Sequence, residues 1–222
     1  KVASADLTNY QLLKKIAKKN KPIILSTGAS SISEIKSTLN FLSQYKVDVI
    51  LNHCVLSYPA PTSSANLGML LNMSEEFPHI IGYSDHTVPD DEHLVLICAV
   101  SFGASVLEKH FTLDKSTPGN DHYHSYDEND LTEFNNKLGI LRTITGKELK
   151  EVLEVELPAR ENARRSLVYF DNYSKGMTIK EEMIVAKRPG TGISPSKFED
   201  FIGKILDVDV KKDEQINPDH FL

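Results

Sequence analysis

Short apolar runs that end in polar residues recur along the first two thirds of the chain. Four of these runs are rich in branched residues and contain Ser, Thr, Asn, Asp, His or Lys near their ends: residues 22–27, 47–54, 80–86 and 105–111. Such runs are typical of strands that are buried on both faces of a parallel sheet. The pattern therefore predicts four parallel strands.

Helical patterns fill the intervals between these runs. In the clearest one, Ser31 and Glu34 form a capping-box sequence at the start of an apolar face. The apolar positions that predict the helices are Leu12, Leu13 and Ile16 within 9–19; Ile32, Ile35, Leu39 and Leu42; Leu67, Leu70 and Leu71; Leu94, Ile97 and Cys98; and Leu131, Phe134, Leu138 and Leu141 after Asp127. A strand followed by a helix, repeated, is a βα array.

Two architectures contain such arrays, the doubly wound sheet and the (β/α)₈ barrel. A barrel builds its site from the carboxyl ends of many strands, whereas an open sheet concentrates its site at one switch point. All four predicted strands end in polar residues, which favours the barrel. We therefore expect an α/β fold in which residues 1–146 form about half of a (β/α)₈ TIM-type barrel.

The pattern changes after residue 146. Residues 147–165 are charged and are expected to form a linker with some helix, and residues 166–222 are expected to form a small β-rich domain. The β-like segments are 166–170, 183–186 and 205–210. A domain of this size buries little core, so we expect it to dock on another surface. Its basic loop at 187–190 contains Arg188, which is merely solvated unless the domain reaches a barrel mouth.

Composition narrows the classes of function. The 222 residues carry a net charge of −6, which argues against a general nucleic-acid or anionic-membrane surface. No apolar run approaches the roughly 20 residues that span a bilayer. Cys54 and Cys98 lie in separate apolar segments, as expected of a reduced, cytoplasmic protein. The chain has no signal peptide and no initiator Met, so we expect it to be part of a longer protein.

Two histidines are the first candidates for chemistry. His86 and His110 end neighbouring predicted strands, so their imidazoles can share a divalent metal. The alternative is one polar core histidine and one surface histidine. Asp121 lies in a loop after the last strand, where it can hold a sugar hydroxyl or position the metal, or simply face solvent.

A second candidate is an anion site near the start of the chain. Lys1 and Ser4 lie at the end of an incomplete strand at the start of the chain, and Ser26 and Thr27 lie at the end of the first complete one. A lysine with hydroxyls and backbone N–H groups suits a phosphate. Asp6 is a candidate charge at the barrel mouth, although an aspartate in such a place is equally often a helix cap.

Five segments resemble one known family. They read, in order, KPIILSTG, HCVLSYPAP, GYSDHT, ASVLEKHFTLD and KRPGTGISP. Together they resemble the sialic acid synthases, which include the N-acetylneuraminate, legionaminic acid and pseudaminic acid synthases. The resemblance covers nearly the whole chain.

The resemblance implies a fold and an activity. The family joins a (β/α)₈ barrel to an antifreeze-like (SAF) domain, so the resemblance implies that residues 1–146 are the C-terminal half of the barrel and residues 166–222 are the SAF domain. It condenses phosphoenolpyruvate with an N-acetylated aldose, such as N-acetylmannosamine, to give a nine-carbon 2-keto acid and phosphate, using Mn²⁺ or Mg²⁺. Its members are cytoplasmic, domain-swapped homodimers in which the SAF domain of one subunit covers the barrel mouth of the other.

The resemblance also implies roles for individual residues. His86 and His110 match the metal ligands, and with Asp6, which matches an acidic position, they are the expected catalytic residues. The positions that match substrate contacts are Lys1, Ser4 and Ser26 for phosphoenolpyruvate, Ser84 for a further polar contact, Tyr58 and Asp121 for the sugar, and Arg188 for the arginine that reaches the partner's site.

The sequence departs from the family in places, and other functions compete. Leu56 stands where several members have Asn, and Asn120 replaces the usual Pro before Asp121. A deoxy-octulosonate-type synthase lacks the SAF tail, and a metal-dependent hydrolase needs more His and Asp at its strand ends. From another class, the alternative is a non-catalytic fragment that binds a carbohydrate or a partner.

Overall fold

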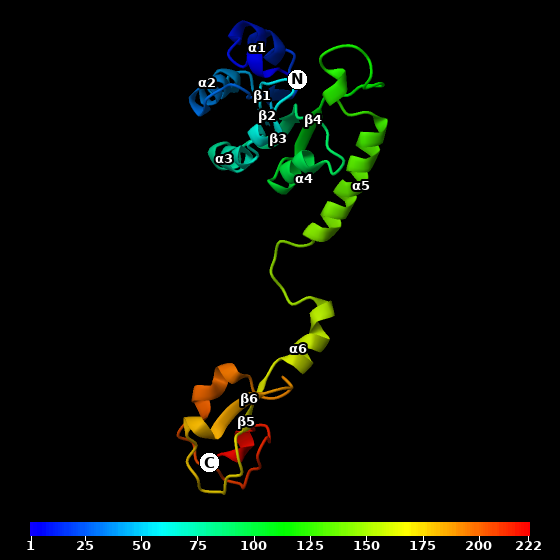
Figure 1. The fold of residues 1–222 in the computed structure, drawn as a ribbon. Helices are drawn as coiled ribbons and strands as arrows, with labels where there is room; N and C mark the ends of the chain where they lie inside the picture. Colours follow the sequence, from blue (N-terminus) through cyan, green and yellow to red (C-terminus); the bar gives the residue numbers. More distant parts are fainter. The chain divides into compact units, whose positions relative to one another are not determined.

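Four parallel strands form the sheet of the first part of the chain. They are β1 (Ile23–Ser26), β2 (Val49–Cys54), β3 (Ile80–Asp85) and β4 (Val106–Lys109). They lie side by side in chain order in the computed structural model, which describes residues 1–222 (Figure 1). The four predicted strands are therefore confirmed. Near the start of the chain, Val2 adds only an isolated parallel bridge to Leu25.

Helices connect the strands. They are α1 (Tyr10–Ala17), α2 (Ile32–Ser43), α3 (Gly68–Glu76), α4 (Leu94–Ser101) and α5 (Glu128–Thr145). Figure 1 shows α1 to α4 following one another around one side of the sheet. The predicted capping box is present, because the Glu34 N–H donates to Ser31 Oγ at 3.3 Å and the Ser31 N–H donates to the Glu34 carboxylate at 2.7 Å.

The buried face of α4 differs from the predicted one. Leu94 is 57% exposed, and the residues that pack into the core are Val95, Leu96 and Ala99. The reason is that α4 is apolar on every side up to Ser101, so its apolar positions do not specify a face. In α3, Leu70 is buried as predicted, whereas the predicted Leu71 is 49% exposed.

The strand register decides which side chains meet at the carboxyl edge of the sheet. Cys54 pairs with Ser84 across β2 and β3, and Asp85 pairs with Lys109 across β3 and β4. The residues that follow directly, His86 and His110, therefore leave the sheet at the same edge.

The chain divides into two units, Lys1–Gly146 and Lys147–Leu222. In the second unit, α6 (Leu157–Ala163) precedes an antiparallel pair, β5 (Ser166–Tyr169) and β6 (Ile184–Lys187). Its own core includes Leu167, Tyr169, Ile179 and Leu206, all at most 2% exposed. The alternating segment 205–210 forms only isolated bridges, from Ile205 to Thr178, Leu206 to Phe221 and Val210 to Tyr173, so the β-like segment expected there is not a regular strand.

Two further features concern the cysteines and the apolar helices. Both cysteines are free thiols, and Cys54 is buried. No helix in the structure combines the length and the apolar character that crossing a membrane requires.

Candidate active site

The two strand-end histidines lie next to each other. The ring centroids of His86 and His110 are 5.2 Å apart, in an edge-to-face arrangement. The ring of Tyr58 lies 4.2 Å from His86 and 5.8 Å from His110, centroid to centroid. The structure therefore brings together three residues that the sequence proposed for the site.

Hydrogen bonding orients the buried His86 ring. Its Nδ1 lies 2.9 Å from the carbonyl oxygen of Val55, so Nδ1 carries the proton and donates it. A neutral imidazole that donates from Nδ1 has a free lone pair on Nε2, which is the arrangement of a metal-binding histidine. Burial lowers the pKa of both His86 and His110, which favours the neutral rings that bind metals.

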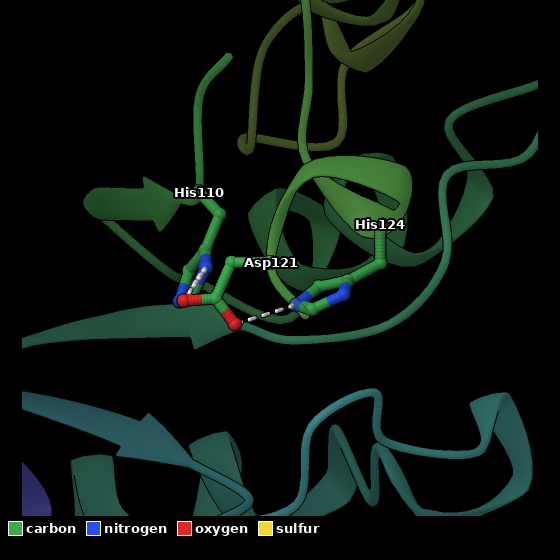
Figure 2. A group of neighbouring side chains, drawn as sticks. All are labelled: His110, Asp121 and His124. Carbon is green, nitrogen blue, oxygen red and sulfur yellow. Dashed lines mark ion pairs between the residues drawn. The ribbon is translucent and has the colours of Figure 1, made fainter. Parts of the chain in front are cut away.

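A loop carries an acidic group and a third histidine to the same place. Asp121 Oδ2 lies 3.8 Å from His110 Nδ1, and Asp121 Oδ1 lies 3.9 Å from His124 Nε2 (Figure 2). One ligand atom from each of these residues lies within 4.8 Å of the others. Sequence reasoning proposed His110 and Asp121 but assigned no role to His124.

The residues fit a divalent ion. Imidazole nitrogens and a carboxylate oxygen are common ligands of Zn²⁺, Fe²⁺ and Mn²⁺. Both ring nitrogens of His124 are buried without a hydrogen-bond partner. A buried polar group in that state calls for a ligand, an ion or a water.

An ionic cluster lies at the ends of β3 and β4. Ser84 Oγ donates to Glu108 Oε1 at 3.0 Å, and the Lys1 ammonium lies 2.7 Å from the same oxygen. Lys1 is about one-third exposed, so it remains accessible to an anion. Glu108 received no role from the sequence, although it stands two residues before His110 in the quoted ASVLEKHFTLD segment.

The two predicted serines differ in their surroundings. Ser4 Oγ accepts a hydrogen bond from the Gly28 N–H at 3.0 Å. Ser26 Oγ is buried with no partner, and so are both amide atoms of Asn52, which pairs with Ser26 across β1 and β2. Sequence reasoning noted Asn52 only as a polar residue near a strand end and assigned it no role.

The other two predicted residues are Asp6 and Arg188. Asp6 ends a short turn, and its carboxylate accepts a hydrogen bond from Asn9 Nδ2 at 3.0 Å, which is a local, cap-like contact. Arg188 is exposed in the second unit, directly after β6.

A cavity of about 660 Å³ opens beside the cluster, near the carboxyl ends of β1 and β2. Its lining includes Thr27, His53, Cys54, Leu56 and Met69. Neither His86 nor His110 lines the cavity, but Cys54 Sγ lies 3.8 Å from His86 Nδ1. The cavity and the histidine cluster therefore meet at Cys54.

Comparisons with known proteins agree with this division of the chain. Residues 1–150 match the NeuB family and residues 164–222 match the SAF domain. An N,N'-diacetyllegionaminic acid synthase of Campylobacter jejuni is 38% identical over 97% of this chain, and the chain spans 65% of that relative's length.

Solved structures show the same likeness. A candidate spore coat polysaccharide biosynthesis protein E of Chromobacterium violaceum superposes with a TM-score of 0.80 over 99% of this chain and 66% of its own, at 21% identity, which shows the fold alone. An N-acetylneuraminic acid synthetase of Leptospira borgpetersenii is 32% identical, with a TM-score of 0.65 over 70% of this chain and 54% of its own. With its parallel sheet, its strand-end histidines and its SAF domain, the chain belongs to the NeuB family.

Proposed function

We propose that this protein condenses phosphoenolpyruvate with an N-acetylated aldose, N-acetylmannosamine or a related amino sugar, to give a nine-carbon 2-keto acid and phosphate. In this proposal the four βα units are the C-terminal half of a (β/α)₈ barrel. The observation that carries the proposal is the cluster of His86, His110, Tyr58 and Asp121 at the carboxyl edge of the sheet. Sites of (β/α)₈ enzymes lie at this edge.

The residues near β3 and β4 suit phosphoenolpyruvate. Its phosphate and carboxylate carry negative charge, which the Lys1 ammonium neutralises. The unpartnered Ser26 hydroxyl donates a hydrogen bond to its oxygens, and the Ser84 hydroxyl does so when it turns away from Glu108. The Ser4 hydroxyl accepts a hydrogen bond from the Gly28 N–H and keeps its own proton to donate to the substrate. Glu108 holds Lys1 in place until the substrate competes for it.

The residues around the histidines suit the sugar. Tyr58 packs against the histidines and offers its hydroxyl and ring face, and the exposed Asp121 carboxylate accepts hydrogen bonds from sugar hydroxyls. A bound Mn²⁺ or Mg²⁺, held by His86 and His110, supplies Lewis-acid polarisation of the open-chain aldehyde. Asp6 is the acid or base that we propose for exchanging protons with the reacting oxygens.

The condensation forms one carbon–carbon bond and breaks one carbon–oxygen bond of phosphoenolpyruvate. The methylene carbon of phosphoenolpyruvate bonds to the aldehyde carbon, and the aldehyde oxygen gains a proton to become a hydroxyl. Water adds to the former enol carbon and gives up its proton. The bond between that carbon and the bridging oxygen then breaks while the added hydroxyl gives its proton to the departing phosphate, so inorganic phosphate leaves and the 2-keto group forms.

The second unit has its own part in the proposal. In a domain-swapped homodimer, Arg188 of the partner subunit completes the site, where its guanidinium binds substrate oxygens. The exposure of Arg188 and the small core of its unit support this role. The protein works in the cytoplasm, where phosphoenolpyruvate is available.

Phosphate release by the full-length gene product tests the proposal. The assay contains phosphoenolpyruvate, Mn²⁺ and a panel of N-acetylated aldoses, and it compares the wild type with His86→Ala and His110→Ala. His79→Ala is the matched control, because His79 precedes β3 at the opposite end of that strand from His86. We expect release that needs an aldose, is lost in both site variants and persists in the control. A folded protein that releases no phosphate with any aldose contradicts the proposal and favours a non-catalytic binding function.

A further inference from the structure

The loop that follows β6 is fixed to the rest of the second unit, although most of it is exposed. We call residues 188–193 the arginine loop, after Arg188 at its start. The Gly190 N–H donates to the carbonyl of Glu161 in α6 at 2.7 Å. A Cβ at Gly190 would lie 2.6 Å from the Cβ of Arg164, so the backbone of the loop lies directly against α6.

One buried hydroxyl holds the arginine loop at two points. Ser166 is the first residue of β5, and it is fully buried. Its Oγ donates to the Pro189 carbonyl at 2.7 Å and accepts a hydrogen bond from the Gly192 N–H at 2.8 Å. A hydroxyl has one proton to donate and lone pairs that accept, so a single side chain satisfies both backbone groups.

The strand register places this hydroxyl beside the arginine. Ser166 pairs with Lys187, the last residue of β6, and Arg188 is the next residue along the chain. The backbone of Arg188 is therefore held on both sides, by the strand pair before it and by the hydrogen bond to Pro189 after it. Arg188 itself is exposed, and no carboxylate lies within 4.0 Å of its guanidinium.

A fixed backbone that carries a free guanidinium suits a preorganised binding group. An arginine side chain loses rotamer freedom when it binds, and a mobile loop would add the entropy cost of ordering its backbone. A loop that is held before binding avoids this second cost. Because no carboxylate of its own unit pairs with Arg188, we interpret the fixed loop as presenting the guanidinium to a ligand.

We propose that Ser166 is a positioning residue that acts through Arg188, by holding the arginine loop in the conformation that presents the guanidinium to substrate oxygens. The inference rests on the proposed function, because that function gives Arg188 its task. It deepens that function by assigning a role to a buried residue of β5 that does not itself touch the substrate.

Hydrogen exchange of the full-length gene product tests the hold on the loop without any substrate. Ser166→Ala removes both hydrogen bonds and adds no bulk, and circular dichroism checks its folding. We expect the amides of the arginine loop to exchange at least about tenfold faster than in the wild type, while the rest of residues 147–222 exchanges as before. A serine with a merely structural role would speed exchange throughout that unit.

Two further variants complete the set. Gly190→Ala displaces the loop from the side of α6, because the new Cβ collides with Arg164, and it leaves the Ser166 hydroxyl intact. It is expected to reproduce the faster exchange, and it supplies the test if Ser166→Ala does not fold. Ser194→Ala is the matched control, since Ser194 directly follows the loop but its Oγ lies 3.0 Å from Ser196 Oγ, and we expect it to behave as the wild type.

Phosphate release shows whether the serine acts through the arginine. We expect Ser166→Ala to lower kcat/KM at least about tenfold. It should change the same constant as Arg188→Lys, either kcat or the KM of one substrate, since lysine keeps the charge but lacks the planar guanidinium. In the double variant the two fold-losses are expected not to multiply, because both substitutions act on one side chain.

The outcomes separate this inference from the proposed function. Unchanged exchange in Ser166→Ala, faster exchange throughout the unit, or faster loop exchange with unchanged kcat/KM overturns the inference and leaves the proposed function untouched. Fold-losses that multiply in the double variant also overturn it. If the folded wild type releases no phosphate with any aldose, the proposed function fails, whereas faster exchange confined to the loop in Ser166→Ala still supports the hold of Ser166 on the loop.

Discussion

The Lys109 ammonium lies 2.7 Å from the Asp85 carboxylate, and both side chains are at least nine-tenths buried. The two residues pair across β3 and β4 in the strand register. Each stands directly before a site histidine, Asp85 before His86 and Lys109 before His110. The ion pair therefore fixes the spacing of the two strand ends from which the histidines leave the sheet.

Asp85→Asn is expected to destabilise the fold strongly. The substitution leaves the buried Lys109 charge without its partner, which costs about 3–5 kcal/mol. Glu76→Gln is the control, because the Lys36–Glu76 pair has a similar separation of 2.6 Å but is exposed, and its loss costs at most about 1 kcal/mol. Urea unfolding measures both. Equal losses in the two variants would show that the buried pair does not hold the strand ends.

Gly82→Ala is expected to disturb the centre of the sheet. An added Cβ would lie 2.6 Å from the Val106 carbonyl oxygen and would also collide with the Asn52 side chain. Overpacking of this kind costs about 1–3 kcal/mol. Gly139→Ala is the control, since its Cβ meets no atom within 4 Å in the middle of α5, and it is expected to raise stability by about 0.5–1 kcal/mol. A Gly82→Ala protein as stable as the wild type in urea would rule out this close approach.

His53 is expected to make the fold sensitive to acid. Burial lowers the pKa of His53 in the folded state, while in the unfolded chain it is about 6.5. The unfolded chain therefore binds more protons below about pH 6.5, so the stability contributed by the neutral ring is complete above that pH and is lost as the pH falls through the lowered pKa.

The measurement is the urea midpoint of wild type and His53→Gln at about pH 7.5 and about pH 5.5. Between these two values we expect the wild type to lose more stability than the variant. His86 and His124 also have lowered pKa values, so the stability of the variant still falls in part as the pH is lowered. If stability falls equally with pH in both proteins, His53 does not cause the acid sensitivity.

Mixing two inactive variants tests whether Arg188 acts across subunits. In a swapped dimer of His86→Ala with Arg188→Ala, one site has both intact residues, so re-equilibrated mixtures are expected to regain up to about a quarter of wild-type phosphate release. Each variant alone is expected to be inactive. If Arg188 acts within its own subunit, every site in the mixture lacks one residue and no activity returns.

The strands of the first unit were predictable, whereas one helix face was not. The runs ending at Ser26, Asn52, Asp85 and Lys109 are short, apolar and rich in branched residues, which fits strands buried on both faces. The prediction of the buried face of α4 was wrong because an apolar helix has no polar side that marks the solvent-facing surface. The segment 205–210 alternates like a strand but finds only single bridging partners, which its own sequence does not encode.

The site was predictable where residues follow strands directly. His86 and His110 meet because adjacent parallel strands end at one edge, and this follows from strand order alone. The positions of Asp121 and His124 depend on the path of a loop that hydrogen bonds to Thr112 and Tyr126 determine. Spacing along the chain contains no information on that path.

The most direct test of the central claim follows the carbon–carbon bond itself. The full-length gene product is incubated with an N-acetylated aldose, divalent metal and phosphoenolpyruvate labelled with ¹³C at its methylene carbon, and the label is observed by NMR. The account predicts that the olefinic signal becomes an aliphatic methylene coupled to the former aldehyde carbon's proton, only when the aldose is present. Label that appears instead in the methyl group of pyruvate, with or without the aldose, would show simple phosphate hydrolysis and would contradict the account.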